Sequence, residues 1–211
     1  MIKQFKKALV LAPHTDDGEF GCGGTINRLV ESGCEVYYAA FSPCRQSVPP
    51  QFPPDILITE VKAATQVLGV KPEHLTIFDY DVRMFNYRRQ DILDDMLRLK
   101  KQIQPDLVFM PSVNDVHQDH QAITNEGLRA YKGTTILCYE LMWNNNNFNT
   151  ACYVSLEERH VNTKIEAITR YESQGNRPYS DVDFLKGQAR VRGVQSGNQY
   201  AEAFEVIRLC L

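Results

Sequence analysis

The chain has 211 residues, of which 43% are hydrophobic and 23% charged, and its formal net charge is −3 at pH 7. These values are typical of one globular domain spanning residues 1–211, and they provide no basic surface that would attract nucleic acid. No apolar run approaches the roughly 20 residues that a membrane helix needs. We therefore expect no nucleic-acid partner and no membrane span, while the oligomeric state stays open.

Strand-like and helix-like segments alternate along the chain. Short apolar runs predict strands at residues 7–12, 34–41, 75–78, 107–111 and 135–143. Amphipathic patterns and capping residues predict helices at residues 23–32, 59–68, 89–104, 119–131, 156–171 and 181–191. Residues 200–209 give a mixed signal, and the proline-rich stretch 42–55 predicts a loop. The alternation predicts an α/β fold, a doubly wound and mostly parallel sheet with helices on both faces (Rossmann-like) in the strand order 3-2-1-4-5.

Polar motifs follow two of these predicted strands directly. The first reads PHTDDGEFGCGG and contains His14, Asp16 and Asp17, while the second reads DVHQDH. The first and fourth strands are neighbours in the expected order, and ligands bind at the carboxyl ends of strands in such sheets. We therefore expect the two motifs to face each other across one crevice.

Two imidazoles and a carboxylate in that crevice favour a catalytic metal site. His14, Asp17 and His120 are the expected ligands, and they leave an open coordination position of the kind found at catalytic Zn²⁺. Mn²⁺ or Fe²⁺ tolerates the same ligands. Asp16 is then free to act as the general base that accepts a proton from water activated by the metal.

The remaining polar residues suggest supporting roles. As an imidazolium, His117 would stabilise a developing oxyanion or protonate a leaving amine. Asp119 would hold a histidine in its reactive tautomer. Arg45, in the proline-rich loop, is the expected substrate contact. Glu19 is either part of a helix cap or a support for the metal site.

The first motif, extended to PHTDDGEFGCGGTI, resembles the AHPDDE signature of the PIG-L/LmbE deacetylases, and HQDH is similar to the HxDH motif of that family. KIEAITRYESQ and RGVQSGNQYAEAF, further along the chain, are also similar to family segments. The resemblance implies a zinc-dependent hydrolase that removes the N-acetyl group from an amino sugar or its conjugate. It implies the same ligands and the same base, with Asp119 orienting His117. Thr15 and Gly18 depart from the signature, which usually has proline and a larger residue there.

Other functions fit parts of the sequence. An amidase acting on a larger glycoconjugate or a thiol conjugate, or a non-catalytic sugar-binding module, would use the same crevice, and Trp143 with the asparagines after it could line a sugar site or form an ordinary polar loop. The GCGG segment suggests a nucleotide site, but it lacks the G-x-G-x-x-G spacing, and the acidic residues before it would repel phosphate. Six cysteines without a CxxC pair predict free thiols. With no secretory signal in view, we expect a reducing, cytoplasmic location.

Overall fold

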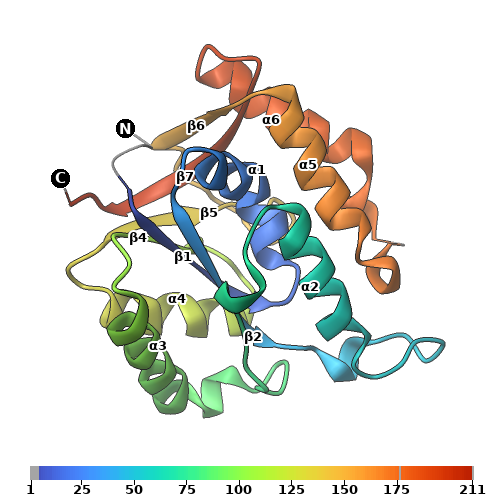
Figure 1. Cartoon of the computed structure of the whole chain (residues 1–211), viewed down its shortest axis with the longest axis vertical. Helices are drawn as coiled ribbons and strands as arrows, with labels where there is room; N and C mark the ends of the chain where they lie inside the picture. Colours follow the sequence, from blue (N-terminus) through green and yellow to red (C-terminus); the bar gives the residue numbers. More distant parts are fainter. Residues whose placement is uncertain (1–4, 176, 211) are drawn as a thin grey trace.

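The computed structural model describes residues 5–175 and 177–210. In these ranges the chain forms one seven-stranded sheet with helices on both faces (Figure 1). The strands are β1 (Lys7–His14), β2 (Glu35–Ser42), β3 (Leu75–Ile77), β4 (Leu107–Pro111), β5 (Thr135–Tyr139), β6 (Cys152–Leu156) and β7 (Tyr200–Arg208). Their order is β3-β2-β1-β4-β5-β7-β6; the first five are parallel, and β7 is antiparallel to both of its neighbours, β5 and β6.

The helices form two layers. Helices α1 (Asp17–Glu31), α2 (Ile56–Val67), α5 (Glu158–Thr169) and α6 (Val182–Gln195) lie on one face, and α3 (Arg89–Ile103) and α4 (Gln118–Ala130) lie on the other (Figure 1). Because both faces are covered, every residue of β4 and β5 is buried. The predicted doubly wound fold and the order 3-2-1-4-5 are confirmed. No helix in the described ranges combines the length and the apolar character needed to cross a bilayer.

The pairing of β1 with β4 decides where the two motifs meet. Ala8 lies opposite Leu107 and Val10 opposite Phe109 in a parallel ladder. Both strands therefore end at the same edge of the sheet, with His14 closing β1 and Pro111 closing β4. The segments that follow the two strands therefore start next to each other, and one enters α1 while the other leads to α4.

Helix α1 begins at Asp17, earlier than the predicted start at Gly23, because it consists of two helical pieces joined by a kink at Cys22 (φ −147°, ψ 23°). The second piece is capped from a distance, since the Glu202 carboxylate of β7 accepts hydrogen bonds from the N–H groups of Gly24 (3.1 Å) and Thr25 (2.7 Å). The prediction therefore located the second piece and missed the first.

The C-terminal third departs most from the predictions. Strand β5 ends at Tyr139 rather than at residue 143, and strand β6 was not predicted, whereas α5 agrees with the helix predicted at residues 156–171. The unassigned segment 200–209 contains β7. Strand β6 is an edge strand that pairs only with β7 and is half-buried, so its sequence has no continuous apolar run.

Candidate active site

The first motif turns sharply out of the sheet. His14 is the last residue of β1 and Asp17 the first residue of α1. The His14 backbone N–H donates to Asp17 Oδ2 at 2.8 Å, which folds the side chain of Asp17 back toward the strand. The same oxygen lies 3.2 Å from His14 Nδ1. One imidazole nitrogen and one carboxylate oxygen are thus held together by the turn itself.

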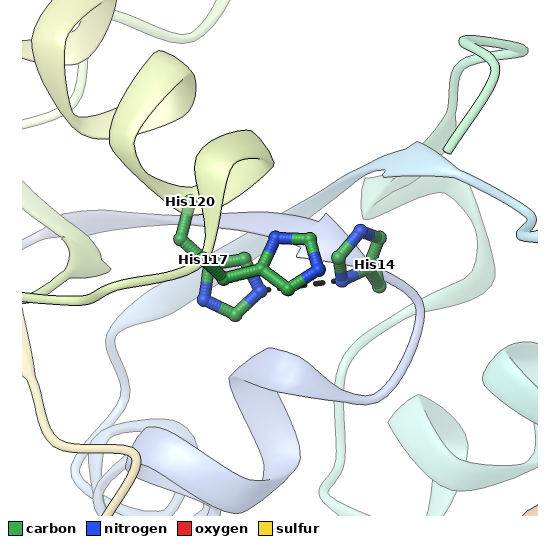
Figure 2. A group of neighbouring side chains, drawn as sticks. All are labelled: His14, His117 and His120. Atoms are coloured by element: carbon green, nitrogen blue, oxygen red, sulfur yellow. Dashed lines mark hydrogen bonds between the residues drawn. The ribbon is translucent and has the colours of Figure 1, made fainter. Parts of the chain in front are cut away.

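Helix α4 brings the second motif to the same place. Its N-cap residue is His117, and His120 follows in the first turn. His120 Nε2 lies 3.2 Å from His14 Nδ1 and 3.3 Å from Asp17 Oδ2. Figure 2 shows the imidazoles of His14, His117 and His120 gathered where β1 ends and α4 begins. The three atoms from His14, Asp17 and His120 form a nearly equilateral triangle.

Each histidine of the triangle has a carboxylate at its other nitrogen. His14 Nε2 lies 3.0 Å from Asp119 Oδ2, and His120 Nδ1 lies 2.7 Å from Asp115 Oδ2. Donation of N–H to these carboxylates leaves a lone pair on the inner nitrogens, and such carboxylate–histidine pairs are common at metal centres. The position of Asp119 corrects one expectation, because its carboxylate contacts His14 and not His117.

Asp115 belongs to the site although the sequence did not single it out. It is 1% exposed, and besides holding His120 it accepts the His117 backbone N–H at 2.8 Å. An aspartate that accepts the N–H two residues further along forms an Asx turn, a common way to start a helix. The spacing of Asp115 before His117 was therefore the available signal.

The electrostatics of the triangle favour a cation. Burial opposes a charge on His120, but Asp17 and Asp115 raise its pKa to about 10. Burial likewise opposes a charge on His14, yet Asp17 and Asp119 raise its pKa overall. Against the effect of burial, the two histidines hold the pKa of Asp17 well below its usual range. Protons and metal ions compete for such ligands.

The donor set fits a divalent metal. Two nitrogens and one carboxylate oxygen are one of the donor sets found at catalytic zinc, and neighbouring ligands at bond lengths of 2.0–2.1 Å around a tetrahedral ion are about 3.3 Å apart. The three distances in the triangle agree with this spacing. The ring nitrogens of His14, His117 and His120 also lie within 4.8 Å of one another, which defines a second candidate set.

His117 differs from the other two histidines in its protonation. Its Nδ1 accepts the Asp119 backbone N–H at 3.1 Å, so the proton of the neutral ring is on Nε2. Burial, together with the nearby His120 and His14, lowers the pKa of His117 to about 4. This lowered pKa favours a neutral ring, which presents an Nε2–H donor, over the expected imidazolium.

Asp16 lies at the N-cap of α1 without capping it, and its carboxylate lines the cavity above the triangle. Burial and the neighbouring Asp17 raise the pKa of Asp16. The nearest cation is Arg177, with 3.7 Å between its Nη1 and Asp16 Oδ2. A buried carboxylate with a raised pKa is the type of group that takes up a proton during catalysis.

The cavity has a volume of about 310 Å³ and an aromatic wall. The rings of Trp143 and Tyr179 are stacked at 3.9 Å, and Phe20 packs edge-on against both. The side chains of Asn144 and Gln174 add amides to the lining. Trp143, which the sequence left as a sugar contact or part of a polar loop, thus lies in the cavity wall.

Arg45 does not line this cavity. Its guanidinium is paired with Asp55 (2.5 Å from Nε) and with Asp79, and it is partly exposed. The expected substrate contact by Arg45 therefore has no support in this arrangement. The cations that line the cavity are Arg83 and Arg177, from segments that carried no sequence signal.

These features define a class: a doubly wound α/β protein with a candidate divalent-metal site in the crevice between two parallel strands. Residues 9–131 match the PIG-L family, described as GlcNAc-PI de-N-acetylase, and these residues are more than half of the chain. The chain belongs to the PIG-L family. The predicted family is thereby confirmed.

Known proteins similar to this chain include deacetylases and one enzyme of another class. The diacetylchitobiose deacetylase of Thermococcus kodakarensis is 23% identical over 96% of this chain and 83% of its own length. The N,N'-diacetylchitobiose deacetylase of Pyrococcus horikoshii is 24% identical, with a TM-score of 0.82 over 98% of this chain and 85% of its own. GalB, the 4-carboxy-2-hydroxymuconate hydratase of Pseudomonas putida KT2440, is 18% identical, with a TM-score of 0.79 over 98% of both chains. Because the fold also occurs in a hydratase, the activity must be argued from the site.

Proposed function

We propose that the protein is a metal-dependent N-deacetylase that removes the acetyl group from an N-acetylated amino sugar or its conjugate. The observation that carries this proposal is the triangle of His14 Nδ1, Asp17 Oδ2 and His120 Nε2, with sides of 3.2–3.3 Å beside a cavity. Membership in the PIG-L family supports it independently.

His14, Asp17 and His120 would hold the metal, and Zn²⁺ suits two imidazoles and a carboxylate best, with Mn²⁺ or Fe²⁺ as alternatives. Asp119 and Asp115 would keep both histidines in the ligating tautomer. A divalent ion bound there would activate water and polarise the amide carbonyl.

The protein groups around the metal would handle the protons. Asp16 would accept a proton from water as its oxygen adds to the carbonyl carbon, and would pass that proton to the nitrogen as the C–N bond breaks. The products are acetate and a free amine. His117 would donate its Nε2–H to the developing oxyanion as a neutral hydrogen-bond donor. The expected acid role of His117 thus moves to Asp16.

The lining of the cavity supports an amino sugar as substrate. Stacked Trp143 and Tyr179 offer an apolar wall, and the amides of Asn144 and Gln174 can bind hydroxyl groups. The similar deacetylases from Thermococcus and Pyrococcus are named for diacetylchitobiose, an N-acetylated sugar.

The proposal is tested by measuring acetate release from a panel of N-acetyl sugars, nucleotide sugars and thiol conjugates. Activity should disappear after metal stripping and return with Zn²⁺. Turnover of thiol conjugates or large glycoconjugates alone would favour the amidase alternative. Binding of sugars with no acetate release at full metal occupancy would favour the non-catalytic module. The cytoplasmic location stays a prediction from the sequence, whose six cysteines form no CxxC pair.

A further inference from the structure

Glu19 is a buried carboxyl group that the proposed chemistry does not use. It is 0% exposed, in the first turn of α1. Its two oxygens contact the hydroxyl groups of Tyr38, from β2, and Tyr171, which follows α5 and lies 2.8 Å away. We call Glu19, Tyr38 and Tyr171 the Tyr–Glu–Tyr cluster.

The cluster is hydrogen-bonded to both ends of the turn that carries Asp16 and Asp17. Both tyrosine hydroxyls approach the carbonyl oxygen of Thr15, at 3.0 Å from Tyr38 and 2.7 Å from Tyr171. At the other end of the turn, the Gly18 N–H donates to the Tyr38 hydroxyl at 3.1 Å. Asp16 and Asp17 lie between these two anchored backbone groups.

Gly18 is needed for this contact. A Cβ added at Gly18 would lie 2.5 Å from Cε2 and 2.6 Å from the hydroxyl oxygen of Tyr38, far inside van der Waals contact. Tyr38 is fully buried and has no room to withdraw. The departure of Gly18 from the family signature therefore has a local cause, because the ring of Tyr38 occupies the space of a larger side chain.

The hydrogens of the cluster are arranged most completely when Glu19 is the neutral acid. Glu19 can then donate to the Tyr38 oxygen, Tyr38 can donate to the Thr15 carbonyl, and Tyr171 can donate to the remaining Glu19 oxygen. An ionised Glu19 leaves only two hydroxyl protons for the same contacts. A glutamine can reproduce the neutral pattern because its amide offers both a donor and an acceptor.

We propose that Glu19, Tyr38 and Tyr171 are positioning residues that fix the turn from Thr15 to Gly18, and so set the Asp17 carboxylate against the histidine pair. This inference rests on the proposed metal site. The Asp17 oxygen completes a triangle with sides of 3.2–3.3 Å, so a shift of the turn by a fraction of an ångström separates it from the histidines. Partners that orient metal ligands typically change metal affinity by about 10–100-fold when removed.

The test is the Zn²⁺ dissociation constant, measured by competition with a chromophoric chelator on folded protein. Tyr171→Phe removes one oxygen atom and should weaken Zn²⁺ binding by about 10–100-fold. Glu19→Ala should weaken it at least as much, while Glu19→Gln should bind within about threefold of wild type, because the amide restores the donor and the acceptor. Tyr131→Phe is the matched control, since that buried tyrosine donates to the Met96 carbonyl at 3.0 Å in the opposite core.

The outcomes separate this inference from the proposed function. If wild type binds no divalent metal, the proposed function fails, and this inference fails with it. If wild type binds Zn²⁺ and Tyr171→Phe binds it as tightly as Tyr131→Phe does, only the positioning role is refuted. Should Glu19→Ala not fold, Tyr171→Phe against Tyr131→Phe decides the question alone. If Glu19→Gln bound Zn²⁺ as weakly as Glu19→Ala does, the hydrogen-bond arrangement with a neutral Glu19 would also be refuted.

Discussion

Asp16→Asn should lower the catalytic rate and, at the same time, raise the stability of the metal-free protein. Asparagine keeps the shape of the side chain but cannot accept a proton, and none of the three triangle atoms belongs to Asp16. We expect the variant to bind Zn²⁺ like wild type and to lose roughly 10²–10⁴-fold in kcat, the usual contribution of a general base. The same change should stabilise the metal-free fold.

The expected gain in stability follows from the sign of the pKa shift. Burial and Asp17 raise the pKa of Asp16 above its value in the unfolded chain. An ionised Asp16 therefore destabilises the folded state, and this cost grows as the pH rises above the unfolded-state pKa. Asparagine removes the charge and gives up the attraction of the carboxylate to Arg177, 3.7 Å away, and to His14. We expect a gain of about 0.5–2 kcal/mol, the range common for substitutions that relieve a functional strain.

Three measurements on the same preparation decide the matter: acetate release at saturating substrate, Zn²⁺ affinity by chelator competition, and urea unfolding in excess chelator at pH 7. Asp16→Ala is a control that also removes the side-chain volume. Near wild-type turnover by Asp16→Asn would refute the base assignment. Loss of Zn²⁺ would instead indicate that Asp16 is a ligand. An unfolding free energy below that of wild type would contradict the electrostatic argument.

Three further predictions concern the histidines of the site and Arg45, which lies outside it. His120→Ala should lose the metal. His117→Ala should keep it and lose about 10²–10³-fold in kcat, as expected for one oxyanion donor. Loss of the metal from His117→Ala in a metal assay would favour the three-histidine ligand set. The Zn²⁺ affinity of the metal-free protein should rise about tenfold per pH unit between roughly pH 6 and 8. The reason is that the pKa of about 10 at His120 keeps a proton there, which Zn²⁺ must displace. The same affinity at every pH in this range, measured by chelator competition, would contradict that account. Arg45→Ala should leave KM and kcat within about twofold, as for most exposed substitutions away from a site, since Arg45 pairs with Asp55 outside the cavity; a large rise in KM would return Arg45 to the substrate.

The sequence was sufficient to predict the sheet order and the convergence of the two motifs. Both follow from local patterns, because alternating strands and helices imply parallel crossovers, and polar residues directly after buried strands must lie at one edge of the sheet. His14, Asp17 and His120 are therefore predictable from position and residue type. The structure adds the side-chain distances that the ligand proposal needs.

Other features of the site depend on contacts that no local pattern encodes. The carboxylate of Asp119 contacts His14, 105 positions earlier in the chain, and only the folded geometry decides this against the adjacent His117. The lowered pKa of His117 depends on burial and on two neighbouring histidines. Arg45 lay in a loop on the correct side of the molecule, but the carboxylates of Asp55 and Asp79 hold it away from the cavity.

Strand β7 has a consequence for how the site is made in the cell. The ribosome synthesises both motifs long before residues 200–208, yet both depend on carboxylates of that segment. Glu202 caps the second piece of α1. Glu205 accepts hydrogen bonds from Ser112 Oγ (2.8 Å) and the Val113 N–H (3.2 Å), in the loop that precedes His117. A nascent chain that ends before β7 can build the parallel strands but leaves these buried donors without their acceptors. The two halves of the site should therefore reach their final geometry only when the last strand has left the exit tunnel and inserted between β5 and β6.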